Sequence, residues 1–231
     1  MTLAGTVGGV RLTILAATGG IGRELLRQAI AAGHDVTAVV RNPARLPDTP
    51  ARVVATDLAA PDPALLRDAV AGNDAVLSGL GARTGAEAGV ASRGTRAVVE
   101  AMRASGVRRI VVVSAASVGT VPSPGRPHPP RHNPGDGPFI RYVATPLAKA
   151  AFGRHYADLA LMEDVLRDSG LDWTVSRPPR LLNVALRRRY RTAIGRNVRG
   201  GAFISRAHVA EHMLDMLDRP ETYHRDIGIA Y

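Results

Sequence analysis

Cysteine is absent from this chain of 231 residues. Its absence excludes disulfide bonds, cysteine-ligated zinc sites and thiol nucleophiles together. Lysine is nearly absent as well, because Lys149 is the only one in the sequence. Any chemistry that pairs a tyrosine with a lysine therefore depends on this single side chain.

Long hydrophobic runs are also missing. No apolar stretch approaches the ~18–20 residues that a bilayer-spanning helix needs. The first residues lack the basic flank and long apolar core of a signal peptide, and Arg11 interrupts the first apolar stretch. Apolar residues make up 45% and charged residues 22%, which is ordinary for a globular domain. We therefore expect a cytoplasmic protein with no membrane association.

Basic residues outnumber acidic ones, which gives a formal net charge of +10. The arginines are spread from Arg11 to Arg225, with one dense cluster at Arg187, Arg188, Arg189 and Arg191. A basic chain can bind nucleic acid, but a helix-turn-helix pattern, zinc-ligand spacing and interleaved aromatic and basic residues are missing. We therefore expect no nucleic-acid partner, while the oligomeric state and the role of the cluster stay open.

The sequence does contain a regular alternation of short apolar runs and helical segments. Apolar runs predict strands at residues 10–17, 35–40, 52–56, 75–78, 109–114, 173–177, 202–204 and 227–231. Helical periodicity predicts helices at residues 21–32, 62–71, 89–105, 147–169 and 206–219. This order predicts one α/β domain over residues 1–231, with a Rossmann-type, doubly wound, mostly parallel sheet and helices on both faces.

Two segments interrupt this regularity. Residues 119–138 are rich in proline and glycine and lie in a predicted loop insertion at about 119–145. So long a stretch without structure is uncommon in a compact domain and is often functional. It is interpreted either as a loop over the substrate side of the sheet or as a disordered surface insertion. Residues 183–200 have no clear assignment, and residues 178–205 are expected to form a small substrate-side part.

A glycine-rich turn of sequence Ala16-Ala17-Thr18-Gly19-Gly20-Ile21-Gly22 joins the first predicted strand to the first helix. Glycines let the backbone approach a pyrophosphate closely, and the amide groups at the start of the helix then bind the anion. Gly19 and Gly22 match the last two glycines of a Thr-Gly-x-x-Gly loop, whereas Ala16 replaces the first glycine in a conservative departure. The position between strand and helix favours dinucleotide binding over a purely structural turn.

The end of the second predicted strand bears on the choice of cofactor. A site that prefers NAD usually places an acidic residue there, to bind the ribose hydroxyls. This chain has Arg41 and Arg45 instead. Both can hold a 2′-phosphate by charge-assisted, forked hydrogen bonds, although both can also be ordinary surface arginines. The sequence therefore favours NADP(H).

Two further segments are expected beside the cofactor. Asp57 and Leu58 follow the third strand, where an adenine would lie, and Asp57 either accepts hydrogen bonds from it or caps the next segment. Gly79, Leu80 and Gly81 follow the fourth strand, where small residues let the backbone pass a cofactor.

The catalytic pair of typical short-chain dehydrogenases is missing. That pair is a tyrosine with a lysine four residues later, and the residue four before Lys149 is Thr145. Tyr142 lies seven residues before Lys149, two helical turns or ~10.5 Å away, which is too far for direct pairing. The standard alcohol dehydrogenase mechanism is therefore disfavoured.

The order of these elements resembles the atypical short-chain dehydrogenase group that contains flavin reductase/biliverdin-IXβ reductase and bacterial NAD(P)H-binding, NmrA-like relatives. The resemblance covers most of the chain. It rests on the glycine loop and on these segments: Val39-Val40-Arg41 with Arg45, Asp57-Leu58, Asp74-Ala75-Val76, Gly81-Ala82-Arg83, Val112–Ala115, Met162–Leu171 and Arg177–Leu181.

The resemblance implies both a set of contacts and a mechanism. NADP contacts would come from Thr18, Gly19, Ile21, Arg41, Arg45, Asp57, Leu58, Gly81 and Arg83. Ser114 and Ala115 would lie near the nicotinamide, and Pro178 and Pro179 would form its far wall. Hydride would pass directly to a conjugated acceptor without a tyrosine–lysine pair. Ser114 is the candidate polar group there, or it merely ends a strand through its backbone.

The chain also departs from this family pattern. Arg180 follows the double proline where the reductases have histidine, and Leu159 replaces a second histidine. Arg180 would either orient an anionic substrate or face solvent.

Other polar residues near the expected pocket receive structural interpretations. His155 and Tyr156 are interpreted as packing and capping residues more than catalytic ones. Glu163 is expected to pair with an arginine on the helix surface, and Trp173 is expected in the core.

Three functions are compatible with these observations. The first is an NADPH-dependent reductase of a small conjugated acceptor such as a flavin, a quinone or a tetrapyrrole-like molecule. The second is a non-catalytic, NADP(H)-sensing regulator of the NmrA type. An isomerase or dehydratase of the related epimerase branch is disfavoured by the missing tyrosine.

Overall fold

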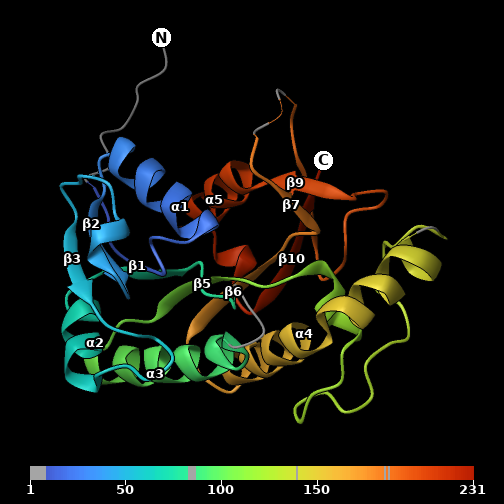
Figure 1. Ribbon diagram of the computed structural model, residues 1–231, viewed down its shortest axis with the longest axis horizontal. Helices are drawn as coiled ribbons and strands as arrows, with labels where there is room; N and C mark the ends of the chain where they lie inside the picture. The colour runs from blue at the N-terminus through green and yellow to red at the C-terminus, as the bar shows by residue number, and fades with distance from the viewer. Residues whose placement is uncertain (1–8, 83–86, 139, 185, 187) are drawn as a thin grey trace.

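The computed structural model describes residues 9–82, 87–138, 140–184, 186 and 188–231. Its centre is an eight-stranded sheet in the order β3-β2-β1-β4-β5-β6-β10-β8 (Figure 1). Neighbouring strands pair in parallel, except that β8 is antiparallel to β10. The strands are β1 (Arg11–Leu15), β2 (Asp35–Val40), β3 (Arg52–Ala55), β4 (Ala75–Ser78), β5 (Arg109–Val113), β6 (Asp172–Arg177), β8 (Arg191–Ile194) and β10 (Arg225–Ala230).

Helices cover both faces of this sheet. The buried side chains form two clusters, one on each face. One cluster lies under α1 (Gly20–Ala31) and α5 (Arg206–Asp215), and the other under α2 (Pro63–Val70), α3 (Val90–Ser105) and α4 (Thr145–Arg167). The predicted Rossmann-type, doubly wound fold is therefore confirmed.

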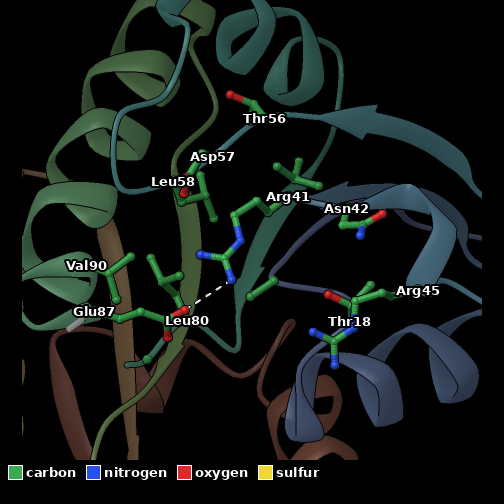
Figure 2. Close-up of a pocket in the computed structure, with 13 residues that line it drawn as sticks. Thr18, Arg41, Asn42, Arg45, Thr56, Asp57, Leu58, Leu80, Glu87 and Val90 are labelled. Carbon is green, nitrogen blue, oxygen red and sulfur yellow. Dashed lines mark hydrogen bonds and ion pairs between the residues drawn. The ribbon is translucent and has the colours of Figure 1, made fainter. Parts of the chain in front are cut away.

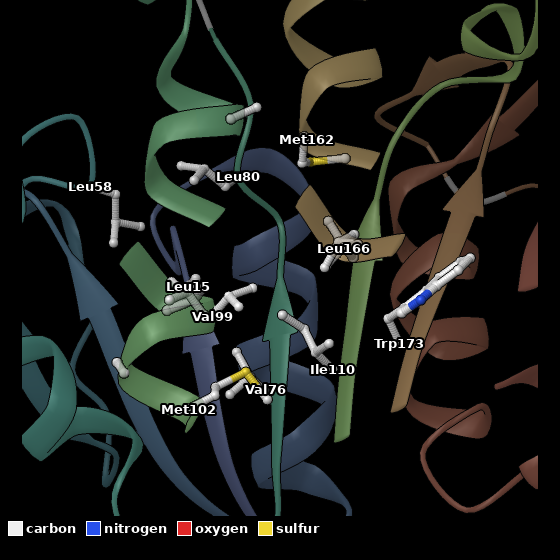
Figure 3. Close-up of a cluster of buried hydrophobic side chains, with 14 of the residues drawn as sticks. Leu15, Leu58, Val76, Leu80, Val99, Met102, Ile110, Met162, Leu166 and Trp173 are labelled. Carbon is white, nitrogen blue, oxygen red and sulfur yellow. The ribbon is translucent and has the colours of Figure 1, made fainter. Parts of the chain in front are cut away.

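The larger cluster explains why the strand sequences are so uniformly apolar. Strands buried on both faces need apolar side chains at successive positions, and β4 and β5 are buried throughout. Figure 3 shows Val76 and Ile110 on these strands, facing Met102 of α3 and Leu166 of α4. Trp173 lies at the same face and is 7% exposed, which confirms its predicted place in the core.

A small second sheet follows β6 in the chain and lies beside α5 and β10 (Figure 1). It pairs β7 (Arg180–Leu182) with β9 (Phe203–Ser205) in parallel. β9 was predicted within one residue, whereas β7 and the antiparallel strand β8 were not predicted. Arg187 of the basic cluster lies outside the described residues.

The proline-rich segment is held against α4 by hydrogen bonds. It is therefore not the disordered surface insertion that the sequence also allowed. The Asp164 carboxylate accepts from the Ser123 hydroxyl at 3.0 Å and from the Gly125 amide at 3.0 Å. Lys149 Nζ donates to the Thr120 carbonyl at 2.8 Å. α4 itself is kinked at Phe152, which has non-helical dihedral angles (φ −123°, ψ 22°).

Among the described residues, no helix is both long and apolar enough to span a bilayer.

Candidate functional site

The predicted phosphate loop joins β1 to α1. Glycine is needed in and beside this loop because neighbouring backbone atoms leave no room for a Cβ. A Cβ on Gly22 would lie 2.2 Å from the Ala16 carbonyl oxygen, and one on Gly79 would lie 2.9 Å from the Gly22 amide nitrogen. Gly19 caps α1 without a side chain, so that the first amide groups of the helix face the loop. This is the geometry by which a helix start binds an anion.

Ala16 occupies the corner where the motif usually begins with glycine. Its φ is +55°, in the left-handed region that side chains with a Cβ adopt at a cost. The sequence interpretation treated this substitution as conservative. That is wrong for the backbone, since the turn keeps the conformation that favours glycine.

A cavity of about 170 Å³ opens beside this loop, and Figure 2 shows the side chains around it. Many of the predicted cofactor residues line it together: Ala16, Thr18, Arg41, Arg45, Asp57, Leu58, Leu80 and Gly81. Arg41, from the end of β2, points across the cavity and pairs with Glu87 (Nη2–Oε1 3.1 Å). Glu87 also lines the cavity and was not predicted.

Asp57 caps a turn, which is one of the two roles expected from its position in the sequence. Its Oδ1 accepts a hydrogen bond from the Ala59 amide at 3.0 Å, so the residue caps the turn after β3. The side chain also lines the cavity, and its contact with an adenine stays a prediction. The predicted contact at Arg83 falls outside the described residues.

A second hollow of about 180 Å³ continues from the first, because Leu80 and Gly81 line both. It is also bordered by these residues: Gly20, Ile21, Gly79, Ser114, His155, Leu159, Leu181 and Arg206. The two hollows form one groove that passes over the loop. The groove runs from the arginines after β2 to Ser114 after β5.

Ser114 is held by two hydrogen bonds at the end of β5. Its amide donates to the Ser176 carbonyl at 2.8 Å, and its hydroxyl donates to Glu163 Oε1 at 2.8 Å. Because the hydroxyl proton is engaged by Glu163, Ser114 presents its lone pairs rather than its proton to the groove.

Glu163 is the centre of a buried ionic network. It pairs with Arg167 (2.8 Å) and with Arg177 (Nε–Oε1 2.9 Å), and Arg177 also reaches Asp226 (3.0 Å). Burial lowers the pKa of Arg177, but the charges of Glu163 and Asp226 outweigh this and raise the pKa. Pairing of Glu163 with an arginine was predicted correctly. Its placement on the helix surface was wrong, because the residue is 1% exposed.

His155 lies in the second hollow, on the turn of α4 that faces Gly81. Its Nδ1 is buried and has no hydrogen-bond partner among the described residues. Burial lowers the pKa of the imidazole, and nearby Asp158 partly offsets this. Asp158 caps α3, because its carboxylate accepts hydrogen bonds from the Ala91 and Ser92 amides at 3.0 Å each.

A third cavity of about 410 Å³ lies at the ends of β5 and β6, where Ala115 and Tyr156, the sequence neighbours of Ser114 and His155, line it. Ala115, Pro178 and Pro179 form its inner wall, and Arg180 also lines it. The outer wall is mostly apolar and includes Ile140, Ala144, Ala148, Phe152 and Tyr156. Its carboxylate, Asp136, already accepts from Asn197 at 2.7 Å. This cavity therefore suits a mostly apolar ligand more than a highly charged one.

The chemistry of the groove fits a dinucleotide. No room is left for a Cβ at Gly22, because the start of α1 lies against the Ala16 carbonyl, as in glycine loops that bind a diphosphate. Cations rather than carboxylates follow β2 on the cavity wall. Among the described residues, no group of three or more His, Asp or Glu side chains is placed to hold a metal ion.

Comparison with known proteins agrees with this geometry. A family model described as NAD(P)H-binding matches residues 16–220. The chain belongs to this NAD(P)H-binding family. The match begins in the glycine loop and includes the whole groove.

Another protein of similar sequence is the uncharacterized protein YwnB of Bacillus subtilis. It is 25% identical over 222 residues, which cover 92% of this chain and 94% of YwnB.

Solved structures share the fold of this NAD(P)H-binding protein. A short-chain dehydrogenase/reductase from Veillonella parvula in complex with NADP has a TM-score of 0.73 at 20% identity, covering 96% of this chain and 94% of its own. ChuY, an anaerobilin reductase from Escherichia coli, has 0.71 at 23% identity, covering 94% and 96%. A Streptococcus pneumoniae protein described as a candidate NADH-flavin reductase has 0.70 at 24% identity, covering 96% and 99%.

Proposed function

We propose that this member of the NAD(P)H-binding family is a reductase that uses NADPH to reduce a flat, conjugated small molecule such as a quinone or a flavin. The observation that carries the proposal is the nearness of two sites. Ser114 lines the groove over the glycine loop, and the next residue, Ala115, lines the mostly apolar cavity of about 410 Å³. Relatives described as an anaerobilin reductase and a candidate NADH-flavin reductase support a conjugated acceptor.

Arg41 and Arg45 support NADPH over NADH. Both line the cavity at the end of β2, where a 2′-phosphate would meet two guanidinium groups. Glu87 holds Arg41 in the absence of that phosphate and keeps the guanidinium over the cavity. A relative solved with NADP points the same way.

The bound nicotinamide would supply the hydride, and the chain would supply position and polarity. Pro178, Pro179, Phe152 and Tyr156 line the cavity, so that an apolar ring would lie mainly against uncharged side chains. The Ser114 hydroxyl donates to Glu163 and would accept a hydrogen bond from a ligand at its end of the groove. Arg180 lines the same cavity and would orient an acceptor that carries an anionic group.

His155 would hold or pass the proton that the reduced acceptor takes up. It lies in the hollow with Ser114, and its Nδ1 is buried without a hydrogen-bond partner among the described residues. Because burial lowers its pKa below the ordinary 6.5, the ring is neutral at neutral pH. A neutral ring can relay a proton between solvent and acceptor.

Binding and turnover are tested separately. Calorimetry should detect NADPH binding to the wild-type protein, and NADPH oxidation should follow when menadione, FMN or dichlorophenolindophenol is added. Gly19→Glu should abolish both, because a carboxylate would stand in the anion site. Binding without oxidation of any acceptor would overturn the reductase proposal and favour an NADP(H)-sensing regulator.

Cofactor choice has its own pair of variants. Arg41→Asp should weaken NADPH binding at least about 10-fold and leave NADH binding nearly unchanged, since a charged contact becomes a repulsion. Glu87→Gln should strengthen NADPH binding by up to about fivefold, because an exposed ion pair that competes with the phosphate is worth up to about 1 kcal/mol. Arg67→Asp on α2, away from the groove, is the control. Equal losses for both cofactors in Arg41→Asp would contradict the assignment.

A further inference from the structure

The first residue of α5 lies across the first residue of α1. A Cβ built on Gly20 would stand 2.6 Å from Nε and 2.7 Å from Cδ of Arg206. The position of α5 is fixed independently of this side chain. Ser205 caps the helix by accepting from the His208 amide at 3.1 Å, and Gln28 of α1 donates to the Ala207 carbonyl at 2.9 Å. The close approach of Arg206 to the loop is therefore built into helix packing.

Arg206 borders the glycine loop on two sides. It lines the second hollow, with Ser114 and His155. It also lines a separate surface hollow with Thr18, Gly19, Arg23 and Arg45. Its Nη1 donates to Asn183 Oδ1, which is a neutral amide. Within the described part of the chain it forms no ion pair, so its positive charge is not neutralised by a carboxylate.

We propose that Arg206 is a diphosphate-binding residue of the NAD(P)H site. The amide groups at the start of α1 bind an anion from one side, and the Arg206 guanidinium faces the same loop from the other. A guanidinium gives forked, charge-assisted hydrogen bonds to phosphate oxygens, which Asn183 cannot match. The proposal also explains Gly20, because any larger residue there would displace the arginine. It rests on cofactor binding in the groove and not on turnover.

Binding of four ligands, three with a diphosphate and one without, distinguishes a diphosphate contact of Arg206 from other roles. Arg206→Gln should weaken NADPH, NADH and ADP-ribose by a similar factor, about 10- to 100-fold, because all three carry the diphosphate. Adenosine 2′-monophosphate lacks it, so its affinity should not change. Arg206→Lys should recover part of the loss. Arg67→Gln, which removes an equal charge from α2 on the opposite face of the sheet, should bind every ligand like the wild type.

Two results would overturn the assignment. The first is wild-type affinity for ADP-ribose in a folded Arg206→Gln protein. The second is an equal loss for adenosine 2′-monophosphate, which would place Arg206 at the adenosine end or give it a purely structural role. Thermal melting without ligand shows whether the variant is folded.

Gly20→Ala provides an independent test that retains the arginine. Its Cβ would push against Nε and Cδ of Arg206, so NADPH and ADP-ribose should again weaken, and the loss should shrink in the Arg206→Gln background. Additive losses in the double variant would contradict the proposal. Wild-type protein that binds NADPH but reduces nothing would refute the reductase and leave the Arg206 assignment standing.

Discussion

At the level of single residues, some members of the site can be predicted from the sequence around them. Others are recognised only when the folded structure shows what they contact. Arg41 and Arg45 were predicted because the end of the second strand is a known place for cofactor selection, and the structure places both on the cavity. Glu87 and Arg206 were missed. Glu87 meets Arg41 from 46 residues away, and Arg206 meets Gly20 from the far end of the chain. Contacts of this kind leave no local pattern.

Ala16 permits a stability prediction. Its φ of +55° costs an alanine about 1 kcal/mol or more, and glycine relieves this while adding some freedom to the unfolded chain. Ala16→Gly should therefore raise the free energy of unfolding by about 0.5–1 kcal/mol, measured by urea denaturation. Ala17→Gly is the control, because its φ is not positive; it should lose stability. A less stable Ala16→Gly protein would show that the turn is not strained.

At the scale of elements, the long periodic segments were predicted almost to the residue. The second and fourth strands agree with the prediction at both ends, since each is a short, mostly apolar segment. Strand β8 escaped prediction because it is an edge strand whose residues Arg191–Ile194 are mostly exposed and show no alternation. Helix α5 was predicted to reach residue 219 but ends at Asp215.

Helix α5 carries a prediction about pH. His212 is buried beside the Tyr190 ring, and burial, aided by Arg219, lowers its pKa to about 4. The folded protein therefore binds this proton less readily than the unfolded chain, whose pKa is about 6.5. The stability contributed by neutral His212 is complete above about pH 6.5 and is lost as the pH falls toward 4.

The measurement compares wild type with His212→Leu at pH 7 and pH 5. Between these values wild type should lose about 2 kcal/mol more of its free energy of unfolding than the variant does, because only wild type has this imidazole to protonate. Parallel losses in the two proteins would mean that His212 is not buried in its neutral form.

At the scale of the whole molecule, one buried ionic network joins the parts on which the site depends. Arg177 of β6 contacts Glu163 of α4 and Asp226 of β10, and Glu163 in turn holds Ser114 after β5. Asp164, next to Glu163, binds the proline-rich segment. Sequence periodicity predicted the elements but could not predict this network, because its charges come from residues far apart in the chain.

Replacing Arg177, the central cation of this network, should destabilise the protein. Arg177→Met leaves Asp226 without its ion-pair partner and Glu163 with Arg167, and removing one partner of a buried pair costs about 3–5 kcal/mol. Because burial already raises the pKa of Asp226, acidification should protonate this carboxyl group and narrow the difference in free energy of unfolding between the variant and wild type. Urea denaturation at pH 7 and pH 5 measures both effects. Arg225→Met, on the exposed start of β10, should change stability by less than about 0.5 kcal/mol.

Strand β10 lies inside the sheet between β6 and β8, and α5 packs on α1 beside the glycine loop. Both elements follow residue 205 in the sequence, whereas the glycine loop lies at residues 16–22. A growing chain on the ribosome therefore contains the loop long before it contains Arg206 and the strand between β6 and β8. We expect such an incomplete chain to bind NADPH weakly until these residues have emerged.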